Sequence, residues 1–321
     1  MLIACRTLAF CQNETNNQVH TKNYVTSAWG QPGDVKVSGT GAKKVILLAG
    51  WGFDGHIFDN FREAHKNEFT MYTVTFPGFG KTHAPPMPDN AESYKDLYWT
   101  KGIIKGLVEL IDQEKMDKPV VISCFTYSEL IALRLALDYP DRIGKVIIIS
   151  GMAKYTANNP SYEPRNIGQR TYYVENMLSK QWFRTVNTQT WNKGNFAPAT
   201  FCKDTVKAKI YWKEMSSVPI PVMVRYLCEY YCTDISLEYQ DLKVPTLVVL
   251  PSFSEKTLCE NTYLAPFFHY SWMGAKTGSK QIQVVTITDS NAFIMDDQPS
   301  KLDGLIKEFL ENGEKQLGFI R

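Results

Sequence analysis

The segment from Lys118 to Ser150 constrains the fold of this chain more than any other stretch. It opens with a short run rich in β-branched residues, Val120–Ser123, which is typical of a buried strand. Residues Glu129–Leu137 carry apolar side chains at helical spacing, and Tyr139-Pro140-Asp141 ends that helix. A second apolar run, Lys145–Ser150, predicts another buried strand. Strand, sharp turn, helix and strand in this order indicate a parallel sheet covered by helices.

The turn between the first strand and the helix has the pattern of a nucleophile elbow, in which a reactive side chain stands on a tight strand-to-helix turn. Such a turn requires small residues two positions before and two positions after its tip. Cys124 and Ser128 meet this requirement and place Thr126 at the tip. Cys124 and Ser128 are rival nucleophiles, but either one at the tip would put bulky neighbours into the turn. A β-branched residue such as Thr126 is unfavourable there, because an elbow tip requires a positive φ.

Residues 124–136, CFTYSELIALRLA, resemble the pattern GHSYGGLIALRLA of the α/β-hydrolase superfamily without a gap. The resemblance covers about residues 25–312 and includes GWG at 50–52, FPGFG at 76–80 and FIMDDQP at 293–299. It implies the α/β-hydrolase fold, an α/β architecture with a mostly parallel central sheet, helices on both faces and an inserted helical lid. It also implies an ancestry in ester or amide hydrolysis that needs no cofactor.

The same resemblance assigns the family's three catalytic positions to Thr126 as nucleophile, Ser254 as acid and Ala292 as base. Ala292 cannot accept a proton, and Ser254 cannot stabilise an imidazolium. Loss of the base alone costs a serine hydrolase on the order of 10⁶ in turnover. The leading hypothesis is therefore a catalytically impaired or ligand-binding protein with a degenerate triad.

The oxyanion hole of the family needs backbone N–H groups only, and the resemblance assigns these to Trp51, after Gly50, and to Tyr127. Glu129 replaces a glycine near this site, where its carboxylate would repel an oxyanion unless it points to solvent. The combined substitution Thr126→Ser, Ser254→Asp and Ala292→His is therefore predicted to produce esterase activity or raise it sharply.

An active hydrolase remains an alternative if Thr126 uses a non-standard base. His83, His56 and His269 are the candidates, because the first two lie beside the motifs of the site and the third could fold over it. Asp289 could then replace the acid. A third hypothesis is an interaction protein whose exposed aromatic residues bind a partner.

The chain divides into four segments by composition. Residues 1–22 predict a disordered leader or a signal remnant, and residues 23–154 and 242–321 predict the hydrolase core. Residues 155–241 lose the strand–helix alternation, become aromatic and predict a helical lid. Between Tyr24 and Thr40 the alternation is broken at Gly30–Asp34, which predicts a hairpin. The aromatic lid favours an apolar or aromatic small molecule as ligand.

Composition and charge limit the classes of partner and cofactor that the sequence predicts. The formal net charge of +2 gives no electrostatic reason to expect nucleic acid, and no apolar run is long enough for a transmembrane segment. Seven scattered cysteines suggest neither a metal site nor another cofactor. Leu2–Cys11 resembles part of an export or lipoprotein signal, but Arg6 interrupts it, so a cytoplasmic location is favoured over export or a lipid anchor. The sequence does not indicate the oligomeric state.

Overall fold

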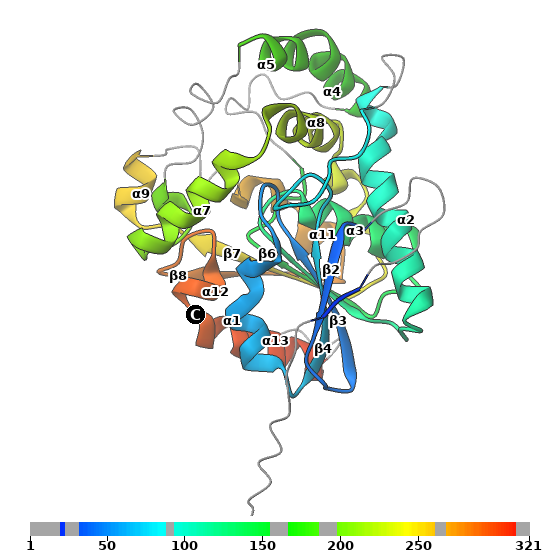
Figure 1. The fold of residues 1–321 in the computed structure, drawn as a ribbon, viewed down its shortest axis with the longest axis vertical. Coiled ribbons are helices and arrows are strands. Elements are labelled where there is room, and N and C mark those ends of the chain that lie inside the picture. The colour runs from blue at the N-terminus through cyan, green and yellow to red at the C-terminus, as the bar shows by residue number, and fades with distance from the viewer. Residues whose placement is uncertain are drawn as a thin grey trace, which may run out of the picture.

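The computed structural model describes residues 20–22, 32–87, 93–154, 166–185, 198–260 and 268–312 (Figure 1). Its centre is an eight-stranded sheet with the strand order β1-β2-β4-β3-β5-β6-β7-β8. β2 pairs antiparallel with β1 and β4, and every pair from β4 through β8 is parallel. The strands are β1 (His20–Lys22), β2 (Asp34–Ser38), β3 (Lys43–Ala49), β4 (Phe69–Thr75), β5 (Val120–Cys124), β6 (Lys145–Ile149), β7 (Thr246–Ser252) and β8 (Ile282–Thr288).

The buried strands follow the apolar runs of the sequence. β3 and β5 pair in register from Val45 with Val120 to Ala49 with Cys124, and β5 pairs with β6 from Val120 with Lys145. Residues on both faces of these central strands are buried, as expected where helices cover both sides of a parallel sheet. The prediction of a mostly parallel α/β sheet is confirmed.

Helices cover the two faces of the sheet in Figure 1. On one side lie α1 (Asp59–His65) and α13 (Pro299–Asn312). A contact between His65 Nε2 and Asp303 Oδ1, 3.3 Å apart, joins these two helices. On the other side lie α2 (Tyr98–Gln113) and α3 (Ser128–Asp138), which pack against each other. The described core also includes the short helices η1 (Gly55–Phe58), η2 (Tyr94–Asp96), α9 (Glu255–Glu260), η8 (Tyr270–Trp272), α11 (Ala275–Gly278) and α12 (Ile294–Asp297).

The described residues between β6 and β7 are helical. They form α4 (Ile167–Tyr173), the π-helical turn η4 (Val174–Leu178), α5 (Ser179–Thr185), η5 (Pro198–Thr200), α7 (Thr205–Ser217), α8 (Ile220–Tyr231), η6 (Ile235–Leu237) and η7 (Tyr239–Asp241). Pro219 and Pro221 flank the first residue of α8, where a missing N–H costs no helical hydrogen bond. In Figure 1 these helices lie at one end of the sheet.

α8 is anchored to loops that follow the carboxyl ends of neighbouring strands. The Trp51 indole donates to the Met223 carbonyl at 3.2 Å, and the Tyr226 hydroxyl donates to the Pro77 carbonyl at 2.7 Å. The Tyr230 hydroxyl donates to the Met152 carbonyl at 3.1 Å. α8 therefore lies over the carboxyl ends of the central strands, where the elbow is.

The N-terminal part differs from the expectation in one respect. His20–Lys22, assigned to the leader, form β1 and pair with Val35–Val37 of β2. The predicted hairpin turn at Gly30–Asp34 lies partly outside the described residues. No helix in the described part of the chain is long and apolar enough to cross a membrane.

Candidate functional site

The elbow is formed where the sequence predicts it, but its backbone strain falls on other residues. β5 ends at Cys124 and α3 begins at Ser128. Phe125 and Tyr127 have φ values of 69° and 76°, whereas Thr126 between them is not in the left-handed region. The prediction of backbone strain at Thr126 is therefore wrong. The two bulky flanking residues, Phe125 and Tyr127, have the unfavourable positive φ instead. Thr126 itself is only 3% exposed.

The predicted oxyanion donor Trp51 already has a partner. Its backbone N–H donates to the carbonyl of Thr126 at 2.8 Å. Gly50 permits this approach, because a Cβ on it would lie 2.5 Å from the Cys124 carbonyl oxygen and 2.7 Å from Phe125 Cβ. The loop after β3 is thus locked onto the elbow by a hydrogen bond that uses the donor an oxyanion would need.

A group of aromatic rings packs beside the elbow. It consists of Phe53, Phe125, Phe201, Tyr211 and Phe293, called here the aromatic cluster, and none of its members is more than 7% exposed. Phe125 stacks on Phe293 with ring centroids 5.6 Å apart, and both rings contact Phe53 edge-on. The cluster joins the loop after β3, the elbow, α7 and the loop before α12.

Ala292, the residue predicted to occupy the position of the base, is fully buried. Its N–H donates to the Thr200 carbonyl at 3.0 Å, and its carbonyl accepts from the Ser150 hydroxyl. The next residue, Phe293, donates its N–H to the Phe201 carbonyl at 2.6 Å and places its ring in the aromatic cluster. The backbone at Ala292 and Phe293 is therefore paired with residues 200–201, and the side chain at position 292 is enclosed.

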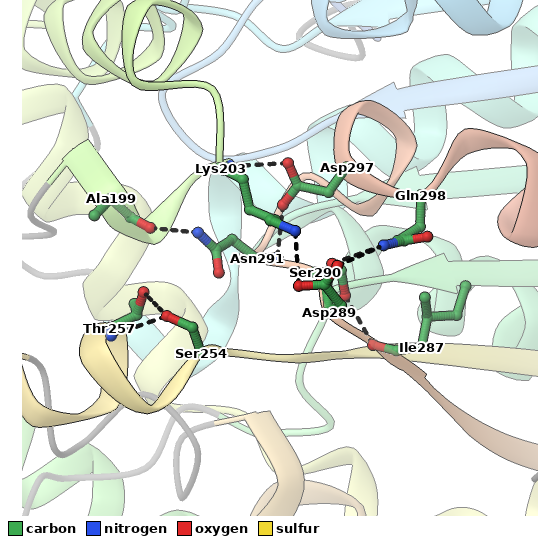
Figure 2. A network of polar contacts seen from close by, with 10 residues as sticks. All are labelled: Ala199, Lys203, Ser254, Thr257, Ile287, Asp289, Ser290, Asn291, Asp297 and Gln298. Carbon is green, nitrogen blue, oxygen red and sulfur yellow. Dashed lines mark hydrogen bonds and ion pairs between the residues drawn. The ribbon is translucent and has the colours of Figure 1, made fainter.

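Ser254, at the position of the acid, is exposed and caps α9. Figure 2 shows its hydroxyl turned toward Thr257, whose Oγ1 lies 2.9 Å away and whose N–H donates to it at 3.2 Å. Serine is a preferred N-cap residue because its oxygen satisfies a free helical N–H. The structure gives no hydrogen bond that links Ser254 to Ala292 or Thr126 within the described residues.

The loop after β8 is held by its own polar network (Figure 2). Asp297 accepts from the N–H groups of Asn291 at 2.7 Å and Lys203 at 2.8 Å. Asp289 is exposed and pairs with the ammonium of Lys203 at 2.7 Å, which lowers the pKa of its carboxyl. Asp289 is thus a turn residue bonded to lysine, and no histidine is given as its partner in the described part of the chain.

The histidines proposed as alternative bases have other partners or surroundings. His56 Nδ1 lies 2.7 Å from Asp54, and its Nε2 lies 3.2 Å from Glu214 of α7. The His269 ring bonds to the Pro251 carbonyl at 3.0 Å, and His83 is exposed. None of the hydrogen bonds given for these rings in the described residues reaches Thr126.

The sequence analysis missed one titratable cluster. Asp54, His56 and Glu214 place their ligand atoms within 4.8 Å of one another, close enough to hold a metal ion. Asp54 and Glu214 are 160 residues apart in the sequence, so no spacing motif could have indicated the cluster. The hydrogen bond to Asp54 raises the pKa of His56, and burial raises that of Glu214 to about 7. The imidazole therefore bridges the carboxyl groups of Asp54 and Glu214 and ties the loop after β3 to α7.

Glu129 lies in the first turn of α3 and is completely buried. The alternative that its side chain points to solvent is therefore wrong. The Tyr230 hydroxyl and the Met152 N–H donate to its carboxylate, the latter at 2.9 Å. Burial raises the pKa of Glu129 to about 7, although Tyr230 and the backbone amides of Met152, Glu129 and Tyr127 oppose the rise. When it is ionised, this buried carboxylate would repel an oxyanion held by the second predicted donor, the N–H of Tyr127.

We expect Glu129 to make the fold less stable as the pH rises. Its pKa lies near 7 in the folded chain against an ordinary 4.5, so the folded state binds more protons between these values. The unfolding free energy then falls through this window, by about 3 kcal/mol from this group alone. Denaturant unfolding at about pH 5 and about pH 8.5 measures the slope. Glu129→Gln should reduce this dependence of the unfolding free energy on pH, whereas the exposed control Glu311→Gln should keep the dependence of the parent. Equal slopes for all three proteins would contradict a raised pKa of Glu129 in the folded chain.

Sequence comparison with known proteins finds esterases that match part of the chain. No family model matches the chain. It is 26% identical over 116 residues to pimeloyl-[acyl-carrier protein] methyl ester esterase of Vibrio campbellii (36% of this chain, 40% of the relative) and 22% identical over 150 residues to that of Proteus mirabilis (46% and 51%). The chain thus spans about half the length of these curated relatives.

Solved structures match nearly the whole chain. An esterase from Thermogutta terrifontis superposes with a TM-score of 0.62 at 18% identity, covering 92% of this chain and all of that one. The enol-lactonase from Burkholderia xenovorans gives a TM-score of 0.63 at 14% identity, covering 86% and 95%. At these identities the likeness concerns the fold.

Proposed function

We propose that this chain, which has the α/β-hydrolase fold and is related to esterases of that fold, binds a small molecule and does not hydrolyse esters through a triad. The observation that carries the proposal is the 2.8 Å hydrogen bond from the Trp51 N–H to the Thr126 carbonyl. Stabilisation of the oxyanion is commonly the largest single catalytic term for acyl transfer, and here one of its two donors is used within the protein.

The triad positions support the same conclusion. Within the described residues no histidine is hydrogen-bonded to Thr126, Ala292 is buried with its backbone paired, and Ser254 caps a helix. Restoring a missing base in such surroundings would require moving the aromatic cluster. Degeneration of the triad therefore extends beyond side-chain identity to the packing of the site.

Binding is supported by the helical segment over the strand ends. We infer that residues 155–241 act as a lid on a core formed by 23–154 and 242–321. Between η1–α1 and α7 lies a cavity of about 220 Å³, lined by the apolar or aromatic side chains of Ile57, Ile210 and Tyr211 and by the polar or charged side chains of His56, Asp59, Asn60 and Lys207. The volume is below the roughly 300–1,000 Å³ of pockets for drug-sized ligands, so we expect a compact apolar or aromatic molecule with one hydrogen-bonding or charged group.

Ester hydrolysis by the purified chain provides the first test. p-Nitrophenyl acetate and butyrate should be cleaved at the same low rate by the parent and by Thr126→Ala, because the hydroxyl does not act as a nucleophile. An ordinary enzymatic rate that Thr126→Ala abolishes would refute the proposal.

Binding is tested separately, by thermal-shift screening of small aromatic acids against the parent and Ile210→Glu. Ile210 lines the cavity and is 56% exposed, so the substitution should leave the fold intact. Ligands should raise the melting temperature of the parent but not of the variant. An absence of hits, or equal shifts in both proteins, would contradict binding at this cavity.

A further inference from the structure

A second cavity, of about 520 Å³, lies at the opposite end of the sheet from the elbow. It is bordered by the first residues of three parallel strands, Lys43 of β3, Val120 of β5 and Lys145 of β6. Ala42, Gly144 and Leu310 add small or apolar surface. The elbow follows the carboxyl end of β5, so this cavity shares no lining residue with the candidate site.

Its lining is strongly basic. Five lysines face it, together with a single acidic residue, Asp117; the lysines are Lys43, Lys44, Lys115, Lys118 and Lys145. The whole chain carries a net charge of only +2, so this is a local concentration of positive charge. Five ammonium groups around one cavity repel one another, and a bound anion would relieve that repulsion.

Two of the five ammonium groups are bonded to backbone carbonyls. Lys145 donates to Phe309 and Leu310 at the end of α13, at 2.8 and 2.9 Å, and Lys44 donates to Glu114. For the side chains of Lys43, Lys115 and Lys118 the structure shows no hydrogen bond or ion pair within the described residues. Three exposed ammonium groups at one cavity therefore remain for a ligand.

The loop that carries two of these lysines is held in an uncommon conformation. Lys115 and Lys118 have φ values of 48° and 45°, which non-glycine residues rarely adopt. The loop is fixed to the start of β6 by the hydrogen bond from the Gly144 N–H to the Pro119 carbonyl at 3.1 Å. Gly144 allows this contact, because a Cβ there would lie 2.4 Å from the Lys118 carbonyl oxygen.

We propose that this lysine-lined cavity binds a small molecule that carries two or more phosphate groups. Lysine is a common phosphate ligand that acts as a point charge, and three such charges suit an oligophosphate better than a single carboxylate. The volume accommodates a molecule of nucleotide size, with the non-phosphate part against Ala42, Val120 and Leu310. Because the cavity is remote from the elbow, the proposal stands independently of any activity there.

The test is calorimetric titration of the full chain with sodium tripolyphosphate, ADP and AMP, at low and high salt. The parent should bind the first two, with an affinity that falls as salt is added, and should bind AMP more weakly. The double variant Lys43→Gln/Lys118→Gln should weaken binding by about tenfold or more. Both side chains are exposed, so thermal unfolding should show an unchanged fold.

The matched control is Lys101→Gln/Lys105→Gln, which removes the same charge from exposed positions on α2. It should bind tripolyphosphate like the parent. Equal weakening in both double variants would indicate general charge attraction and would overturn the proposal. So would the absence of heat with all three anions in the millimolar range. Stronger binding of ADP than of tripolyphosphate would assign the natural ligand to nucleotides, and the reverse order to simpler oligophosphates; either result supports the site.

Discussion

The combined variant Thr126→Ser, Ser254→Asp and Ala292→His should hydrolyse p-nitrophenyl acetate no faster than the parent. A complete triad is worth on the order of 10⁶ in turnover, so recovery of even a small part of it would be measurable. The sequence alone suggested that these substitutions would restore activity, and the packing of the site reverses that expectation. The Trp51 N–H stays bonded to the Thr126 carbonyl, and the Ser254 side chain points to Thr257.

The third substitution has the largest structural cost. Ala292 is fully buried, pairs with Thr200 and is followed by Phe293 of the aromatic cluster. A histidine there overpacks a closed region, which typically costs 1–3 kcal/mol. The variant should therefore also melt below the parent, while the control Ser254→Asp alone should not, because Asp is a good N-cap. A folded triple variant with a gain of several orders of magnitude would show that the site can still open.

Phe125→Ala should lower the free energy of unfolding by about 3–5 kcal/mol. Phe125 is completely buried, stacks on Phe293 and contacts Phe53 and Phe201. Removing the ring therefore loses buried apolar area and leaves a cavity between the elbow and the loop before α12. Denaturant unfolding with a two-state fit provides the measurement.

The control for this variant is Tyr172→Ala on α4, an aromatic truncation at a side chain that is 68% exposed. Surface substitutions of this kind change stability by about 0.5 kcal/mol or less. A loss below about 1 kcal/mol for Phe125→Ala would mean that the aromatic cluster does not stabilise the fold.

The fold was predictable because its signals are local. The apolar runs Val120–Ser123 and Lys145–Ser150 match β5 and β6 to within one residue, and the elbow motif located the turn between β5 and α3. Residues 94–113 form two separate helices, η2 and α2, because Leu97 adopts a left-handed conformation between them. Nothing in the sequence pattern marks that break.

The site was less predictable because its contacts join distant parts of the chain. The sequence identifies which side chains a triad lacks, but not that a carbonyl of the elbow takes the Trp51 N–H. It gave no sign that Glu214 would reach His56, or that Tyr230 would keep Glu129 buried. Side-chain identity at the motif positions was therefore informative, whereas occupancy of the backbone donors depended on tertiary packing.

Covalent labelling measures whether the Thr126 hydroxyl can act as a nucleophile. A fluorophosphonate probe modifies a hydroxyl that is activated as a nucleophile beside a functional oxyanion hole, and intact-mass spectrometry detects the adduct. The parent chain should keep its unmodified mass under conditions in which an ordinary serine esterase is fully labelled. A phosphonate adduct on Thr126, mapped by peptide sequencing and absent from Thr126→Ala, would contradict the account.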